Sequence, residues 1–311
     1  MIRMIQQFPL FLAFSSAAVA ASLVGEVRRA LGREEFAAAE KIVETARGQT
    51  GVTPEWLEAH SWLGRGALAG KDPEKALTYA GQTRKMALEL LKGRKLDDER
   101  RLPIALGASI EVQAQAMAAR GERSEAVAFL QRELKTWNAT SIRIRLQKNL
   151  NLLALEGQPA PPIDTRTSLG GPTPPLSSLK GRAVLLFFWA HWCGDCKEQA
   201  PVLARLAREF PLTVVGPTQR YGYVAHGEEA EPEKETAYIE EVRKRFYAEI
   251  PGMTVPVSEE SFKQYGASTT PTLVLLDSRG IVRGYHPGHL SYEDLAARIR
   301  KITAGDQTRS R

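Results

Sequence analysis

The sequence predicts an α/β domain with a central mixed sheet, preceded by an all-helical domain. Between residues 22 and 156, apolar side chains recur at three- and four-residue spacing, which is typical of amphipathic helices. Two segments rich in proline and glycine, 157–162 and 170–175, interrupt this pattern. Beyond them, short apolar runs alternate with helical segments, and such alternation is typical of a sheet flanked by helices. A chain of 311 residues is long enough for about two domains.

The N-terminal segment, residues 1–20, resembles an export signal. Arg3 provides a basic start, residues 8–14 form a short apolar core, and Ala18-Val19-Ala20 is a small-residue cleavage site. The alternative is an uncleaved membrane anchor, because no charged residue lies between Arg3 and Glu26. Polar residues dilute the segment below an ordinary membrane span. We therefore expect cleavage and a periplasmic or otherwise extracytoplasmic protein.

The net charge of +6 does not indicate a nucleic-acid partner. Basic residues are scattered among acidic ones, and no aromatic residues are interleaved with them. The five histidines show no paired spacing that would complete a zinc site, and two cysteines alone cannot form a tetrahedral one. We therefore expect neither a metal nor a bound cofactor.

The helical domain is expected to span residues 21–156. Thr53-Pro54 and Asp72-Pro73 each place a capping side chain before a proline at the first helical position. The region resembles tetratricopeptide-type helical hairpins, although the spacing between copies is irregular, and a generic antiparallel bundle is the alternative. A stacked array would offer a concave surface to a protein partner. A rigid spacer or a dimerisation element is the other interpretation.

The α/β domain is expected to span residues 181–304, after a linker and lead-in segment at 157–180 and before a disordered tail at 305–311. Its expected strands are 184–189, 212–215, 272–276 and 281–284, and its expected helices are 193–210, 234–247 and 291–302. The stretch 216–234 is longer than an ordinary connection. We expect a solvated acidic surface loop there, and a wall of the substrate groove is the alternative.

The first of these strands runs into Cys193-Gly194-Asp195-Cys196, which holds the only two cysteines of the chain. A Cys-x-x-Cys at the start of a helix puts both sulfurs on one face, close enough to bond to each other. The helix N-terminus favours a thiolate at the first cysteine. A purely structural disulfide would close too short a loop to add much stability. The arrangement therefore indicates dithiol–disulfide exchange.

Several motifs make residues from about 157 to 304 resemble the thioredoxin fold, and more narrowly the exported thiol–disulfide oxidoreductases of the TlpA/ResA type. These motifs are Ala160-Pro161, the run 176–182, Phe188-Trp189-Ala190-His191-Trp192-Cys193-Gly194-Asp195-Cys196-Lys197, Pro201, and Tyr265-Gly266-Ala267-Ser268-Thr269-Thr270-Pro271-Thr272-Leu273. The resemblance implies a thioredoxin-like α/β fold and a protein thiol–disulfide oxidoreductase that needs no cofactor.

The resemblance also implies a role for each site residue. Cys193 is the attacking thiolate and Cys196 is the buried resolving thiol. Trp192 forms a flat apolar rim against which a substrate packs. Pro271 is a cis-proline facing the disulfide, with an ordinary strand-initiating proline as the alternative. Thr270 offers backbone groups to an extended substrate segment.

The chain departs from these relatives at three places. Phe187 stands where thioredoxins carry a buried aspartate, and Gln199 stands where ResA-type reductases carry a glutamate, so the usual proton acceptor for Cys196 is missing. Asp195, between the cysteines, opposes thiolate formation by like-charge repulsion. A less stable thiolate makes the pair more reducing. A protonated His191 would offset part of this effect, unless it is only a polar surface residue.

The predicted function is a reductase of disulfides in exported client proteins. The resemblance implies a membrane electron-relay protein that reduces the pair again, because no thioredoxin reductase is at hand outside the cytoplasm. Two alternatives stay open. One is an oxidase or isomerase with the same site and a more oxidising pair. The other is an interaction protein whose helical domain binds the partner while the thioredoxin-like module is secondary.

Overall fold

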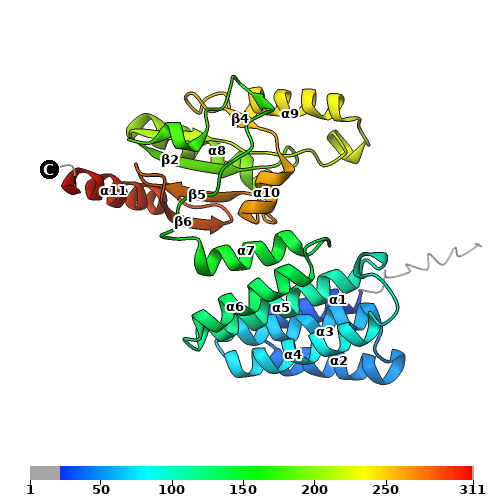
Figure 1. The fold of residues 1–311 in the computed structure, drawn as a ribbon. Helices are drawn as coiled ribbons and strands as arrows, with labels where there is room; N and C mark the ends of the chain where they lie inside the picture. Colours follow the sequence, from blue (N-terminus) through cyan, green and yellow to red (C-terminus); the bar gives the residue numbers. More distant parts are fainter. Residues whose placement is uncertain (1–21, 310–311) are drawn as a thin grey trace, which may run out of the picture.

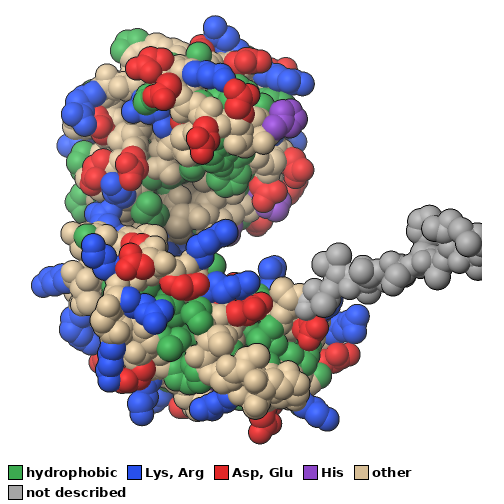
Figure 2. Space-filling view, turned by 90° about the vertical axis from the view of Figure 1, so that its right-hand side faces the viewer, with side chains coloured by type: hydrophobic (Ala, Val, Ile, Leu, Met, Phe, Trp, Pro, Cys, Tyr) green, Lys and Arg blue, Asp and Glu red, His purple; other side chains and the backbone are tan. Residues whose placement is uncertain are grey.

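The computed structural model describes residues 22–309, so the predicted signal peptide lies outside the described residues. Figure 1 shows two lobes, one formed by helices α1 to α7 and the other by the sheet with its covering helices. Within residues 22–309, no helix is long and apolar enough to cross a membrane. Figure 2 shows basic and acidic side chains interspersed over both lobes, in keeping with the scattered charges of the sequence.

The first lobe is helical, as predicted. The Thr53 side chain accepts a hydrogen bond from the Trp56 N–H (3.1 Å), and Asp72 accepts one from the Lys75 N–H (3.0 Å), so both predicted helix starts are confirmed. The similarity of its hairpins to tetratricopeptide repeats stays a prediction. Its helices are α1 (Leu23–Gly32), α2 (Phe36–Thr50), α3 (Pro54–Ala69), α4 (Pro73–Leu90), α5 (Arg101–Ala119), α6 (Arg123–Thr136) and α7 (Arg143–Ala154).

The second lobe is built around a four-stranded mixed sheet with the strand order β3-β2-β5-β6. β2 (Ala183–Phe188) runs parallel to β3 (Leu212–Val215) and antiparallel to β5 (Thr272–Leu276), and β5 pairs antiparallel with β6 (Val282–Pro287). Every residue of β2 is buried, as a central strand covered on both faces requires. The predicted mixed sheet is confirmed.

Helices cover both faces of this sheet. Leu185 and Phe187 of β2 share one core with side chains of α8 (Gly194–Glu209), α9 (Pro232–Phe246) and α11 (Tyr292–Arg309). Leu186 and Phe188 share the opposite core with α10 (Glu259–Tyr265). The alternation of side chains along β2 therefore divides the lobe into two apolar layers.

Three features of the second lobe differ from the sequence-based expectations. α10 and the short antiparallel pair of β1 (Ser168–Leu169) with β4 (Val255–Pro256) were not expected. α11 continues to Arg309, whereas the sequence predicted its end at residue 302 and a disordered tail from 305. Extending a helix costs little free energy, because each added residue gains one hydrogen bond, whereas starting a new helix fixes several residues for its first bond.

Helix α7 is the helix of the first lobe that faces the second lobe (Figure 1), and it packs against α10 and β6. The Asn151 side chain donates a hydrogen bond to the Gln264 carbonyl oxygen (3.3 Å). Gly266, at the end of α10, has a φ of +60°, and a Cβ there would lie 2.2 Å from the backbone nitrogen of Lys148. Only glycine allows this close approach. The helical lobe therefore rests on the segment that leads into β5.

Candidate active site

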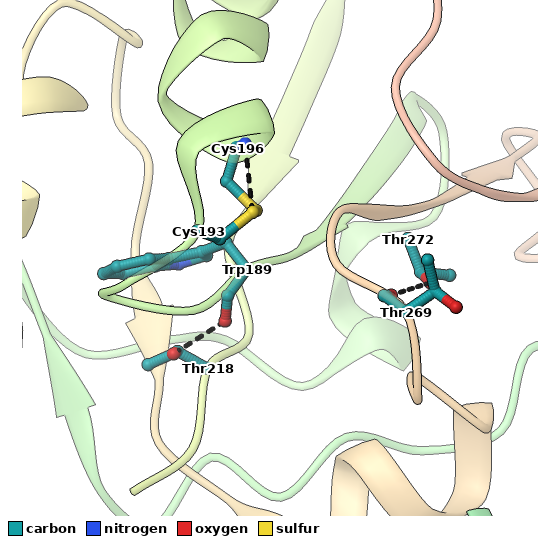
Figure 3. Close-up of a disulfide and its surroundings, with 6 residues drawn as sticks. All are labelled: Trp189, Cys193, Cys196, Thr218, Thr269 and Thr272. Carbon is teal, nitrogen blue, oxygen red and sulfur yellow. Dashed lines mark hydrogen bonds between the residues drawn. A yellow bond between two sulfur atoms is a disulfide. The ribbon is translucent and has the colours of Figure 1, made fainter. Parts of the chain in front are cut away.

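The two cysteines lie where β2 passes into α8. Cys193 is the N-cap of α8, and its sulfur accepts a hydrogen bond from the Cys196 N–H (3.0 Å). The two residues form a disulfide with their Cα atoms 5.3 Å apart (Figure 3), which confirms the close approach expected from their spacing. Cys193 is 3% exposed and Cys196 is fully buried. The Cys196 N–H in the first helical turn thus points toward the first sulfur, where the positive end of the helix dipole favours a thiolate.

Backbone contacts anchor the loop between β2 and the disulfide. The Trp189 indole N–H donates to the Gly216 carbonyl (2.9 Å), and the Thr218 hydroxyl donates to the Trp189 carbonyl (2.8 Å), as Figure 3 shows for the second bond. All three residues lie near the ends of β2 and β3, which are neighbours in the sheet. These bonds hold the loop that presents Cys193 against the end of the parallel strand pair.

A cis peptide bond joins Thr270 to Pro271, as the resemblance implied. Thr272 stands opposite Phe188 in the β2–β5 register, so the turn before β5 and the loop after β2 meet at one edge of the sheet. Figure 3 shows Thr269 and Thr272, joined by a hydrogen bond, on the turn to the right of the disulfide. The Thr270 hydroxyl oxygen is buried and has no hydrogen-bond partner within the described chain. The roles of Thr270 and Pro271 in substrate binding stay predictions.

Trp192 is the large apolar side chain that stands out at this edge. It is 51% exposed and touches Tyr221 edge-on, with ring centroids 5.6 Å apart. Because burying an apolar surface of this size is favourable, an exposed tryptophan directly before Cys193 is suited to pack against another apolar surface. Its exposure fits the predicted rim, while the contact with a substrate stays a prediction.

His191 is not a surface residue, contrary to one of the sequence-based interpretations. It is 1% exposed, and its Nε2 lies 3.2 Å from a carboxylate oxygen of Glu235, which is equally buried. Burial lowers the pKa of His191, and the neighbouring Glu235 only partly counteracts this shift. The ring is therefore neutral near pH 7, so His191 does not supply the positive charge by which its protonated form would offset Asp195. Three tyrosine rings surround it edge-on: Tyr221, Tyr223 and Tyr238.

The stretch 216–234 was expected to be a solvated surface loop, and this is only half right. Glu228, Glu229, Glu231 and Glu233 are exposed, but the tyrosine pair before them packs against His191 and Trp192. Glu235 holds this part of the loop by accepting hydrogen bonds from the backbone N–H groups of Tyr221 and Gly222. The sequence offered no signal for Glu235, because one glutamate in an acidic run looks like its exposed neighbours.

The two positions at which thioredoxins and ResA-type reductases carry an acidic residue supply no proton acceptor for Cys196 here. Phe187 is fully buried and packs edge-on against Tyr247. Gln199 is 1% exposed and makes two hydrogen bonds to Leu290: its Nε2 donates to the carbonyl oxygen (3.1 Å), and its Oε1 accepts from the N–H (2.8 Å). This amide clamp ties α8 to the segment before α11. In the residues that the structure describes, no group of three or more His, Cys, Asp or Glu could hold a metal ion.

The comparisons with known proteins agree with this geometry. Residues 177–303 match the family described as a thioredoxin-like domain. This stretch is a thioredoxin-like domain. The chain is 28% identical over 149 residues to the thioredoxin-like protein YneN of Bacillus subtilis, an alignment that covers 46% of this chain and 78% of the relative.

Two further relatives carry names that describe thiol chemistry. The thiol:disulfide interchange protein DsbE of Xylella fastidiosa is 29% identical over 153 residues, covering 49% of this chain and 71% of the relative. The thiol-disulfide oxidoreductase ResA of Geobacillus thermodenitrificans is 26% identical over 132 residues, covering 41% and 67%. Together with the Cys193–Cys196 disulfide, these matches make the thioredoxin-like domain a thiol–disulfide oxidoreductase.

Proposed function

We propose that this protein is an extracytoplasmic reductase of disulfides in exported client proteins. The observation that carries the reaction type is the Cys193–Cys196 pair at the start of α8. In the reduced protein, the Cys193 thiolate attacks a client disulfide, and one client sulfur leaves as a thiolate. Cys196 then loses its proton, attacks the Cys193 sulfur and releases the second client thiolate. The client gains two electrons, and the pair ends as the internal disulfide.

The charges beside the pair support the reducing direction. Asp195 lies exposed in the first turn of α8 and adds a like charge near the Cys193 thiolate. His191 does not compensate, because its lowered pKa leaves it neutral. By opposing the stabilisation that the helix N-terminus gives to the Cys193 thiolate, Asp195 disfavours the dithiol form, and the pair gives up electrons more readily.

The extracytoplasmic location rests on the pattern of the first 20 residues and on cysteine usage. A chain that keeps only the two cysteines of its redox pair has no stray thiol to oxidise outside the cytoplasm. There, the oxidised pair needs an electron donor, and we propose a membrane electron-relay protein for this step. The helical lobe is proposed to contact a further protein.

The test of direction is the midpoint potential of the Cys193/Cys196 pair, equilibrated against dithiothreitol or glutathione. A value near about −270 mV supports the reductase, whereas a value near about −120 mV means an oxidase and contradicts the proposal. Asp195→Asn should make the pair less reducing by about 10–30 mV, because it removes the like charge. Glu198→Gln, an exposed neighbour on the same helix, is the matched control and should leave the potential within error.

The clients and the interaction alternative are tested by trapping. Cys196→Ser should accumulate a mixed disulfide between Cys193 and a client, because the resolving thiol is gone. Cys193→Ser should abolish both this adduct and the biological activity. Survival of the activity in Cys193→Ser would instead favour an interaction protein with a secondary redox module.

A further inference from the structure

The helical lobe carries a hollow of about 870 Å³ between α1, the turn that follows it and the second half of α3. Leu31 and Phe36 form an apolar floor, and both lie over Gly66 of α3. A Cβ at Gly66 would lie 2.6 Å from a methyl carbon of Leu31 and 3.2 Å from the ring of Phe36. Glycine inside a helix weakens it, so its presence here is explained by the close approach of these two side chains.

Two arginines face the indole of Trp62 at this hollow. The Arg28 guanidinium carbon lies 4.7 Å from the ring centroid, and that of Arg65 lies 4.4 Å from it. In the described part of the chain, no carboxylate oxygen lies within 4.0 Å of either guanidinium, whereas Arg84, Arg101 and Arg145 each have a glutamate partner. Without a carboxylate partner, the exposed Arg28 and the half-buried Arg65 present hydrogen-bond donors and positive charge to the hollow.

Arg65 carries its charge in a partly buried place, and Trp62 has a hydrogen-bond donor that is unpaired within residues 22–309. Burial, together with the nearby Arg145 and Arg28, lowers the pKa of Arg65 to about 10 in spite of Glu111 and Glu58. The indole N–H of Trp62 is buried and has no hydrogen-bond partner among the residues that the structure describes. Lys71 adds a third cation to the lining, against the single acidic side chain of Glu34.

We propose that this hollow, formed by Arg28, Trp62 and Arg65 over the floor of Leu31 and Phe36, binds a peptide segment of a partner protein that carries a carboxylate next to a bulky apolar side chain. The site offers donors and positive charge but almost no acceptors, so its ligand supplies acceptors and negative charge. The apolar floor takes the neighbouring side chain, and the volume lies within the range of ordinary ligand sites. The proposal concerns the helical lobe and does not depend on the direction of the redox reaction.

Two blocked peptides test the proposal on the mature, full-length protein by isothermal titration calorimetry or NMR. One is acetyl-Ser-Glu-Phe-Ser-amide, and the other has glutamine in place of glutamate. We expect the glutamate peptide to bind at least ten times more tightly, with an affinity that falls as salt is raised. A third peptide, acetyl-Ser-Gln-Phe with a free C-terminus, distinguishes a side-chain carboxylate from a terminal one. Equal affinities for the first two peptides, or no binding up to millimolar concentration, would overturn the proposal.

Matched variants locate the binding. Arg65→Gln should weaken the glutamate peptide at least tenfold and leave the glutamine peptide unchanged. Arg33→Gln removes an exposed arginine just after α1 that does not line the hollow, and it should have no effect. Gly66→Ala should weaken both peptides by displacing the floor. Equal losses in Arg33→Gln and Arg65→Gln mean unspecific charge attraction and contradict the site. If acetate binds as tightly as the glutamate peptide, the apolar floor adds nothing to the affinity, and the proposal of a neighbouring apolar side chain is contradicted.

Discussion

Replacing Gln199 by glutamate tests what the amide clamp does at the active site. Gln199 lies one turn after Cys196, and its amide pairs with both backbone groups of Leu290. Two residues earlier in the same segment, the Gly288 N–H donates to the Pro271 carbonyl (2.7 Å). The clamp therefore connects the helix that carries Cys196 to the cis-proline turn. Glutamate has nearly the same shape and keeps the acceptor, but when ionised it cannot donate to the Leu290 carbonyl.

The expected loss of stability in Gln199→Glu has two contributions, an unpaired carbonyl oxygen and a buried charge. Leaving a carbonyl without its donor costs about 1–3 kcal/mol, and burying the charge adds to this, since Gln199 is 1% exposed. We expect Gln199→Glu to lower the free energy of unfolding by about 3 kcal/mol at pH 8. Burial raises the pKa of the new carboxyl in the folded state above its unfolded value of about 4.3. Stability is therefore best retained below that value and is lost as pH rises through the folded pKa, by up to about 1.4 kcal/mol per pH unit.

The assay is urea unfolding of the oxidised protein at several pH values between 4.5 and 8, together with hydrogen exchange of the Leu290 amide. Gln199→Met, which loses both hydrogen bonds without adding a charge, should be destabilised by an amount that does not change with pH. Glu198→Gln, at the exposed neighbouring position, should change neither measurement. A loss in Gln199→Glu that is flat across this pH range and equal to that of Gln199→Met would refute the reasoning.

Two other perturbations probe contacts that position the site. Gly266→Ala should separate α7 from α10, because its Cβ would meet the Lys148 backbone, and we expect a loss of at least about 2 kcal/mol with faster proteolysis between the lobes. Gly252→Ala, also at positive φ (+63°) but with open space around it, should cost only about 1 kcal/mol, and an equal cost in both variants would contradict the docking argument. Glu235→Gln should lower the pKa of His191 further, because it removes the charge that now raises it, and NMR titration of the imidazole measures this shift. An unchanged or higher value would mean that Glu235 does not act on the ring as a charge.

The helices and strands that the sequence determined are those whose signal is local. The strand at β2 and the helix starts at Pro54 and Pro73 follow from apolar runs, capping side chains and proline positions, and these act within a few residues. The Cys193–Cys196 bond follows equally from spacing, because one helical turn brings the two sulfurs together. The short α10 was missed, because seven residues are too few to show a period.

Tertiary structure alone decided the surroundings of the redox pair. From the sequence, a surface position was one interpretation of His191. In the structure, Glu235, 44 positions away, and three tyrosine rings enclose it. Gln199 looked like a lost proton acceptor, and its amide proved to be matched to Leu290, 91 positions along the chain. The physical reason is common to both. Burial and hydrogen-bond partners set the charge and the role of a polar side chain, and these depend on which distant segments the fold brings together.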